Sequence, residues 1–228
     1  MLKYAIKMYL REIFMNTTYW VILGLLLGAE YFAATQYESS LAFVELLQFI
    51  AIPIYIFLVS TVFFTEDKVL TFELVLFRKW STVARGRLLS LLLSILPFMI
   101  FTVFLAGHYN RNDLIAPISV AILFYSSAVL ISTTIGGGSR LYVLSMGLLF
   151  MLPFSSLVLI QNQANIGNPV QGFMGYLTYL FAPIYGSYAV SSGILLVNVD
   201  KANLGILLFS FLLGLGYLYI FERREVYP

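Results

Sequence analysis

The stretch TEDKVLTFELVLFRKWSTVARGR (residues 65–87) separates two long apolar runs and holds five of the thirteen Lys and Arg residues of the chain. Its apolar residues at 70, 74, 77 and 80 recur every three to four positions, which is the spacing of one helical face. A short amphipathic helix between two membrane spans is therefore predicted. Since basic residues collect on the cytoplasmic side of a membrane protein, this loop is expected to be cytoplasmic.

The composition of the 228-residue chain is typical of an integral membrane protein. It is 61% hydrophobic and 11% charged, whereas soluble domains are roughly 45–50% apolar and about 25% charged. The chain has no cysteine, which excludes disulfides, thiol catalysis and thiolate metal sites. Its net charge of +2 is divided between the two sides of the membrane, so no nucleic-acid partner is expected.

The expected fold class is an all-α membrane protein with six transmembrane helices. Each apolar run is long enough, at ~1.5 Å per residue, to cross a hydrocarbon core about 30 Å thick. Residues 1–15 precede them as a predicted interfacial helix, with Lys3, Lys7 and Arg11 on one stripe. The predicted spans are 18–34, 42–64, 88–107, 114–135, 141–160 and 204–221.

Residues 161–203 are predicted to form an extracellular region of broken helices. Two short apolar pieces, 175–183 and 185–196, are interrupted by Pro183 and Gly186. Such pieces are tolerated at membrane depth only when they pack against protein, so re-entrant or interfacial helices are favoured. The alternative, that 185–196 crosses the membrane as a seventh span, stays open at this stage.

Six spans place both termini on one side of the membrane, here the cytoplasm. With this orientation eleven Lys and Arg residues lie inside and two, Arg111 and Lys201, lie outside, as the positive-inside rule requires. The chain is therefore expected to be a multi-pass protein of the cell membrane.

Catalytic motifs are missing from the sequence. There is no GxSxG, HExxH or GxxxxGK[ST] pattern, and GGGSR (136–140) lacks the Lys of a phosphate-binding loop. The single histidine, His108, ends a span and has no candidate nucleophile beside it. We expect no catalytic residue, no metal site and no enzyme activity on this chain.

Two acidic residues and two glycines are further candidates. Glu30 and Glu45 lie near span ends and are possible contacts on a substrate pathway; from the outer turns each carboxylate is expected to reach water by snorkelling. Gly24 and Gly28 form a small-xxx-small pair, which favours a dimer contact or an intramolecular contact but also arises without a role.

Several motifs are similar to those of the type-2 ATP-binding-cassette (ABC) permeases, whose loop after the second span reads approximately ExExGTLExLL, followed by GK before the third span. EDKVLTFELVL (66–76) and RGR (85–87) occupy these positions. APIY (182–185) resembles NPLxY before the last span, and FERRE (221–225) resembles the basic exit. Lys68, Leu70, Ala182 and Arg87 depart from the family pattern.

The resemblance implies the membrane subunit, or permease, of an exporter. In that family two such subunits form the translocation pathway, and each binds a cytoplasmic ABC ATPase that holds ATP and Mg, so no cofactor is expected on this chain. The helix after the second span is the coupling helix, which places Glu66, Thr71 and Glu73 at motif positions. Arg78 and Lys79 are added because they are charged and flank the helix end.

Three questions stay open from the sequence alone. The first is whether the two permeases form a homodimer or a heterodimer. The substrate class is lipid-like, peptide or drug-like. The alternative function is a non-transporting membrane scaffold or accessory subunit, in which the basic residues only set topology and contact lipid.

Overall fold

The computed structural model describes residues 1–36, 40–61, 72–73, 75–77, 79–135 and 139–223, and these residues are nearly all helical. In the described part, six helical segments are long and apolar enough to cross a membrane. This confirms a multi-pass, all-α membrane protein. The six segments are Thr17–Thr35, Leu41–Ser60, Trp80–His108, Asn112–Thr134, Val143–Ile166 and Val199–Glu222.

The first half of the chain supplies α1 and three of the spans. α1 (Leu2–Phe14) leads into α2 (Thr17–Gln36), the first span. The second span joins α3 (Ser40–Leu46), the π-helical turn η1 (Leu47–Ala51) and α4 (Ile52–Ser60). Pro53 explains the π turn, because its missing N–H leaves a carbonyl one turn earlier without its usual partner. The third span is α6 (Trp80–His108).

The second half begins with η3 (Asn112–Leu114) and α7 (Ile115–Ile135). The fifth span joins α8 (Ser139–Met146), η4 (Gly147–Met151) and α9 (Leu152–Ile166), again with a π turn before a proline, Pro153. Then follow β1 (Val170–Gln171), α10 (Gly172–Phe181), α11 (Pro183–Ser191), β2 (Leu195–Leu196) and α12 (Val199–Glu222).

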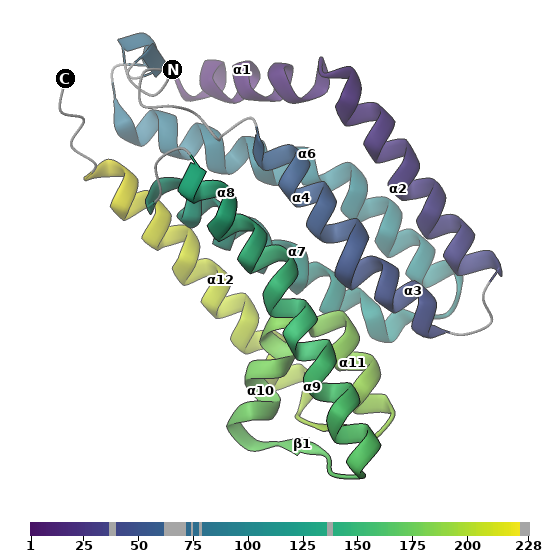
Figure 1. Ribbon diagram of the computed structural model, residues 1–228. Helices are drawn as coiled ribbons and strands as arrows, with labels where there is room; N and C mark the ends of the chain where they lie inside the picture. The colour runs from purple at the N-terminus through teal and green to yellow at the C-terminus, as the bar shows by residue number, and fades with distance from the viewer. Residues whose placement is uncertain (37–39, 62–71, 74, 78, 136–138, 224–228) are drawn as a thin grey trace.

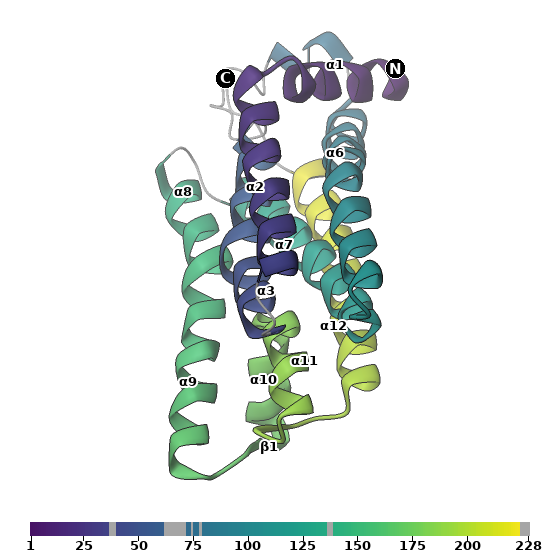
Figure 2. The same ribbon diagram turned by 90° about the vertical axis from the view of Figure 1, so that its right-hand side faces the viewer.

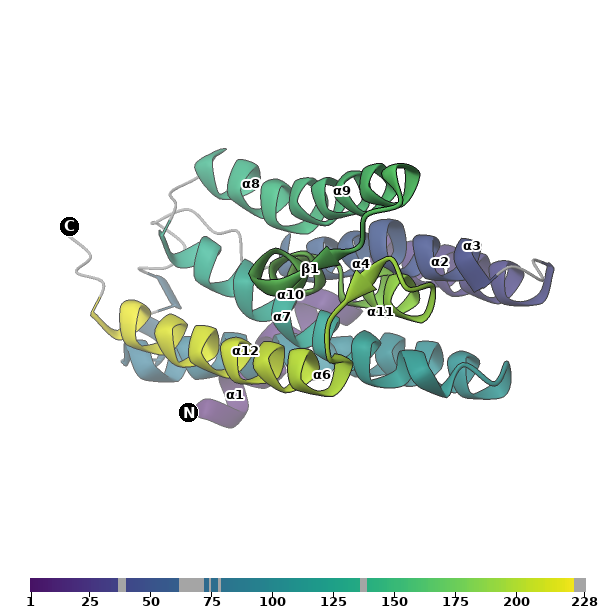
Figure 3. The ribbon, with the colours of Figure 1, turned by 90° about the horizontal axis from the view of Figure 1, so that it is seen from below.

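α7 is the central helix of the bundle. It contacts α12, α6, α4, α8 and α11, and Figure 3 shows helices on several sides of it. Most of its span is buried inside the protein, whereas the outer spans α2 and α12 are mostly exposed. Since all six spans are apolar, the exposed surfaces of the outer spans are suited to contact with lipid.

α1 lies across one end of the bundle, over the ends of the spans (Figures 1 and 2). Ala5, Tyr9 and Ile13 form its buried face, four residues apart, and the helix packs on α6. α1 crosses α6 at Gly86, where an added Cβ would lie 2.9 Å from Ala5 Cβ. The three basic residues of α1 are exposed, so its amphipathic character is as predicted.

α10 and α11 lie at the opposite end (Figure 2). The chain bends at Ala182, and β2 pairs in parallel with β1 after α11, with Val170 opposite Leu195. At ~1.5 Å per residue, the nine residues of α11 reach only about 14 Å, which is half of a hydrocarbon core. The alternative of a seventh span over 185–196 is therefore wrong.

Three span boundaries differ from the prediction by five residues or more, and one of them is the start of α12, at Val199 rather than 204. α6 begins at Trp80 rather than 88, because residues 80–87 contain no proline and their buried face packs on α1. α9 continues to Ile166 rather than 160, because its polar residues remain helical until Gly167, whose φ of 74° ends the helix. The polar side chains at the end of α9 therefore do not end the helix, whereas the left-handed glycine that follows them does.

We expect Gly86→Val to weaken the protein by forcing α1 away from α6. Overpacking of this kind lowers the free energy of unfolding by roughly 1–3 kcal/mol. Denaturant unfolding in detergent measures the change. Gly28→Val is the matched control, since no atom lies within 4 Å of the Cβ position there; equal losses in the two variants would contradict the close crossing.

Candidate functional site

A buried ion pair joins Glu73, in the segment that includes residues 72–73 and 75–77, to Arg87 on the third span. Nη2 of Arg87 lies 2.8 Å from Oε2 of Glu73, and Nε of the same guanidinium lies 3.2 Å from that oxygen. The hydroxyl of Tyr9 donates to the same Oε2 at 2.7 Å. The Arg87 and Glu73 side chains are 3% and 5% exposed. One carboxylate oxygen therefore holds together three parts of the chain that are distant in sequence.

Aromatic rings enclose the guanidinium of Arg87. Its Cζ lies 5.8 Å from the centroid of the Tyr9 ring and 5.6 Å from that of Phe221 on α12. Both distances are in the range of a cation–π contact. Phe221 also packs edge-to-face on Trp80, with ring centroids 5.4 Å apart. This junction, defined as Tyr9, Glu73, Arg87 and Phe221, connects α1, the 72–77 segment, α6 and α12.

Burial makes the junction sensitive to the loss of one partner. Removing two charges from water costs several kcal/mol per ion, which only the partner charge and further hydrogen bonds offset. Burial also raises the pKa of the Tyr9 phenol, so Tyr9 stays a neutral donor over the physiological pH range. Burial, and then the charge of Glu73, raises the pKa of Glu12 on α1.

The structure places only some of the predicted coupling residues. Glu66, Thr71 and Arg78 lie outside the described residues. Lys79 is exposed and immediately precedes α6. Glu73 is buried, so its carboxylate faces the bundle rather than a partner protein. A direct contact between this carboxylate and an ATPase, which the sequence suggested, does not fit that position.

The outer face of the same segment is apolar. Residues 72–73 and 75–77 are helical, with Phe77 buried on the inner side. Phe72, Val75 and Leu76 are 64%, 74% and 47% exposed. These three side chains, with Lys79, are named the outer face of the segment. The sequence did not predict this face, because the predicted apolar face of the helix contains Phe77 but not Phe72, Val75 or Leu76.

Sequence reasoning also missed Arg87 and Tyr9. One signal was available, since an arginine directly before a long apolar run needs a buried partner or water. Three acidic residues lie within 25 positions before Arg87, namely Glu66, Asp67 and Glu73. No local pattern distinguishes Glu73 among them, and the hydroxyl of Tyr9 comes from 64 residues away.

Glu30 is fully buried between α2 and α6. Oγ1 of Thr102 donates to its Oε2 at 2.9 Å, and Oε1 has no hydrogen-bond partner among the described residues. The expectation that Glu30 reaches water by snorkelling is wrong. Glu30 shares the buried face of α2 with Leu23, Leu26 and Ala33, and this face directs the carboxyl toward α6 and not along the helix.

Glu45 lies in a different place. It is half-buried and lines a groove of about 510 Å³ together with apolar residues of α2, the second span and α9. Glu30 is not among the lining residues, so the structure does not bring the two acids into one site. Gly24 and Gly28 are exposed, and no atom of the described residues lies within 4 Å of their Cβ positions; a dimer contact stays a prediction.

A second buried network holds the break between α10 and α11. Nε2 of Gln48, in the π turn η1, donates to the hydroxyl of Tyr125 at 2.6 Å, and this hydroxyl donates to the carbonyl of Phe181 at 2.5 Å. The backbone N–H of Ile184 donates to Oε1 of Gln48 at 2.9 Å. Both the last carbonyl of α10 and an amide at the start of α11 are thereby satisfied.

Comparison of the chain with protein-family models, with curated proteins and with solved structures gives no match. The function is therefore inferred from the geometry of the chain and from the motifs of its sequence.

We expect Glu73→Leu and Arg87→Leu each to lower the free energy of unfolding by about 3–5 kcal/mol, because each leaves one buried charge without its partner. The double variant should recover most of this loss, since two leucines suit an apolar site. Denaturant unfolding in detergent measures all three. Lys79→Leu, at an exposed cation, is the control and should change stability by at most ~0.5 kcal/mol; additive losses in the double variant would contradict the pairing.

Proposed function

We propose that this chain is the membrane permease subunit of an ATP-driven exporter of the ABC type-2 kind. Two permeases, identical or homologous, would form the translocation pathway. A separate cytoplasmic ABC ATPase would bind ATP and Mg. The observation that carries the proposal is the buried junction, because it attaches a short helical segment between spans rigidly to α1, α6 and α12.

The junction suits mechanical coupling. A force applied to residues 72–77 passes through the Glu73–Arg87 pair into α6 and through Tyr9 into α1. Packed protein interiors are stiff, so a displacement at the junction moves whole helices rather than single side chains. α6 also packs on α7, the central helix. Motion of an ATPase can thus reach the middle of the bundle.

The outer face of the segment is the proposed contact with the ATPase. Three exposed apolar side chains at the water-facing end of a membrane protein need a cover, and an apolar helix face in a partner's groove is a common solution. Exposed cations surround this end, with Lys79 next to the segment and Lys3, Lys7 and Arg11 on α1. The partner's groove is therefore expected to have an acidic rim.

The proposed orientation puts the junction, both termini and α1 in the cytoplasm and α10–α11 outside. It is supported by the positive-inside rule, because Arg111 and Lys201 are the basic residues of the opposite end in the described part. α10 and α11 would cover the pathway from outside. The motifs shared with type-2 permeases support export of a lipid-like, peptide or drug-like substrate.

One observation favours a second function, that of a non-transporting membrane scaffold. Both grooves described in this bundle are lined almost wholly by apolar side chains, as expected of surfaces that only meet lipid. A scaffold would bind its soluble partner through the same outer face. The two functions differ in whether ATP hydrolysis by the partner depends on the junction.

Purification of the intact complex tests the proposal. We expect a chain with a P-loop to co-purify and to hydrolyse ATP in proteoliposomes. Val75→Asp should weaken the complex at least tenfold, because a charge would enter an apolar contact. Asn168→Asp adds the same charge at an exposed position of the opposite end and is the control. Absence of a P-loop chain, or unchanged affinity with Val75→Asp, would contradict the proposal.

The two acids make separable predictions for transport. Glu30→Ala removes the hydrogen bond from Thr102 in the bundle interior, and Glu45→Ala removes the acid of the α2–α9 groove. If either lies on the substrate pathway, its alanine variant lowers transport without lowering the affinity for the ATPase. Transport equal to that of the unaltered protein would remove that residue from the pathway.

A further inference from the structure

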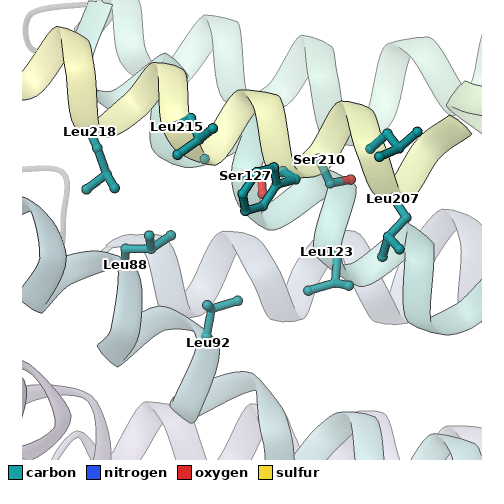
Figure 4. A pocket seen from close by; sticks show the side chains of 11 residues that line it. Leu88, Leu92, Leu123, Ser127, Leu207, Ser210, Leu215 and Leu218 are labelled. Atoms are coloured by element: carbon teal, nitrogen blue, oxygen red, sulfur yellow. The ribbon is translucent and has the colours of Figure 1, made fainter. Parts of the chain in front are cut away.

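A groove of about 520 Å³ lies between α6 and α12, with α7 as its floor (Figure 4). Leu88 and Leu92 line it from α6, Leu123 from α7, and Leu207, Leu215 and Leu218 from α12. This volume is in the range of ~300–1,000 Å³ that is usual for small-molecule sites. No residue of the junction lines the groove, and neither do Glu30 and Glu45.

The residues that line the groove favour a hydrocarbon ligand. Eight of its eleven residues are Leu or Phe, and the polar ones are Ser127 and Ser210. The hydroxyl of Ser210 donates to the carbonyl of Ile206 at 2.7 Å, so it is already satisfied by its own helix. Among the described residues, no charged residue lines the groove. A ligand here gains affinity through apolar contact.

The dimensions of the groove match one lipid chain. Leu207 and Leu218 are eleven residues apart on α12, which is about 16 Å at ~1.5 Å per residue and half of a hydrocarbon core ~30 Å thick. A volume of about 520 Å³ over this length leaves a mean cross-section of about 32 Å².

The position of the groove indicates where a headgroup would lie. Leu88 and Leu92 belong to the first half of α6 and Leu218 to the last turns of α12, whereas Leu207 lies in the first half of α12, so the groove runs from the middle of the bundle toward the junction end. Arg85 precedes Leu88 by three residues and Leu92 by seven, which places it on the same face of α6, one turn nearer the end. Arg85 is exposed, so its guanidinium can meet an anion at headgroup depth.

We propose that this groove binds one acyl chain of an anionic phospholipid and that Arg85 binds the phosphate of its headgroup. The bound lipid fills the space between α6 and α12 on the lipid-facing side. Because α6 carries Arg87 and α12 carries Phe221, the lipid stabilises the relative position of two helices of the junction. This proposal rests on the groove and on the position of Arg85, and it does not depend on the transport function.

Gly214 gives a direct way to fill the groove. It lines the groove and has no atom within 4 Å of its Cβ position, so Gly214→Leu adds a side chain without a clash. Gly205→Leu is the matched control on the same helix, also with no atom within 4 Å, at a position that does not line the groove. Arg85→Gln tests the headgroup contact, and Lys79→Gln is its control at another exposed cation.

The experiment counts phospholipids that remain on the purified protein by native mass spectrometry. The protein is taken from nanodiscs of equal parts phosphatidylglycerol and phosphatidylcholine and is washed in detergent. We expect one phosphatidylglycerol per chain on the unaltered protein and on both controls, and a several-fold loss with Gly214→Leu. Arg85→Gln should remove the preference for phosphatidylglycerol while a lipid is still bound.

Three results would overturn the proposal. The first is equal lipid retention by Gly214→Leu and Gly205→Leu, which would show only general contact with bulk lipid. The second is a change of oligomeric state with Gly214→Leu at unchanged lipid count, which would assign the groove to a second copy. The third is an unchanged preference for phosphatidylglycerol in Arg85→Gln. Leu92→Trp fills the groove from α6 and replaces Gly214→Leu if that variant does not fold.

Discussion

One carboxylate oxygen, Oε2 of Glu73, accepts hydrogen bonds from both Arg87 and Tyr9 in a site that excludes water. These hydrogen bonds join the segment between the second and third spans to α1, through Tyr9, and to α6, through Arg87. A buried ion pair of this kind adds little net stability when compared with apolar packing, but it tolerates only one arrangement of its partners. It is therefore suited to fixing the position of the segment, which the proposed coupling role requires.

The sequence predicted those parts of the fold that depend on residues close together in the chain. Apolar runs of sufficient length predicted the six spans, and the four-residue spacing of Lys3, Lys7 and Arg11 predicted the amphipathic α1. Helix ends were less predictable, since four of the five residues 161–165 are polar and yet α9 continues to Ile166. The break at Ala182 and Pro183 was visible in the sequence, but the network from Gln48 and Tyr125 that holds it was not.

The site was predictable only in part, because its contacts join residues distant in sequence. The stretch 65–87 was identified from charge and periodicity, and Glu73 was singled out by its motif position. The direction of its side chain depends on Arg87 and on Tyr9, which no local pattern pairs with it. Glu30 shows the same limit, since its face on α2, and not its distance from the span end, determines that it is buried.

The central claim, that the junction transmits motion and does more than stabilise the fold, is tested most directly by the Glu73→Leu/Arg87→Leu double variant in proteoliposomes with its ATPase. The measured quantity is substrate-stimulated ATP hydrolysis, with the affinity for the ATPase determined in parallel. The account predicts a folded variant that binds the ATPase but has lost the stimulation. Stimulation equal to that of the unaltered protein would contradict it.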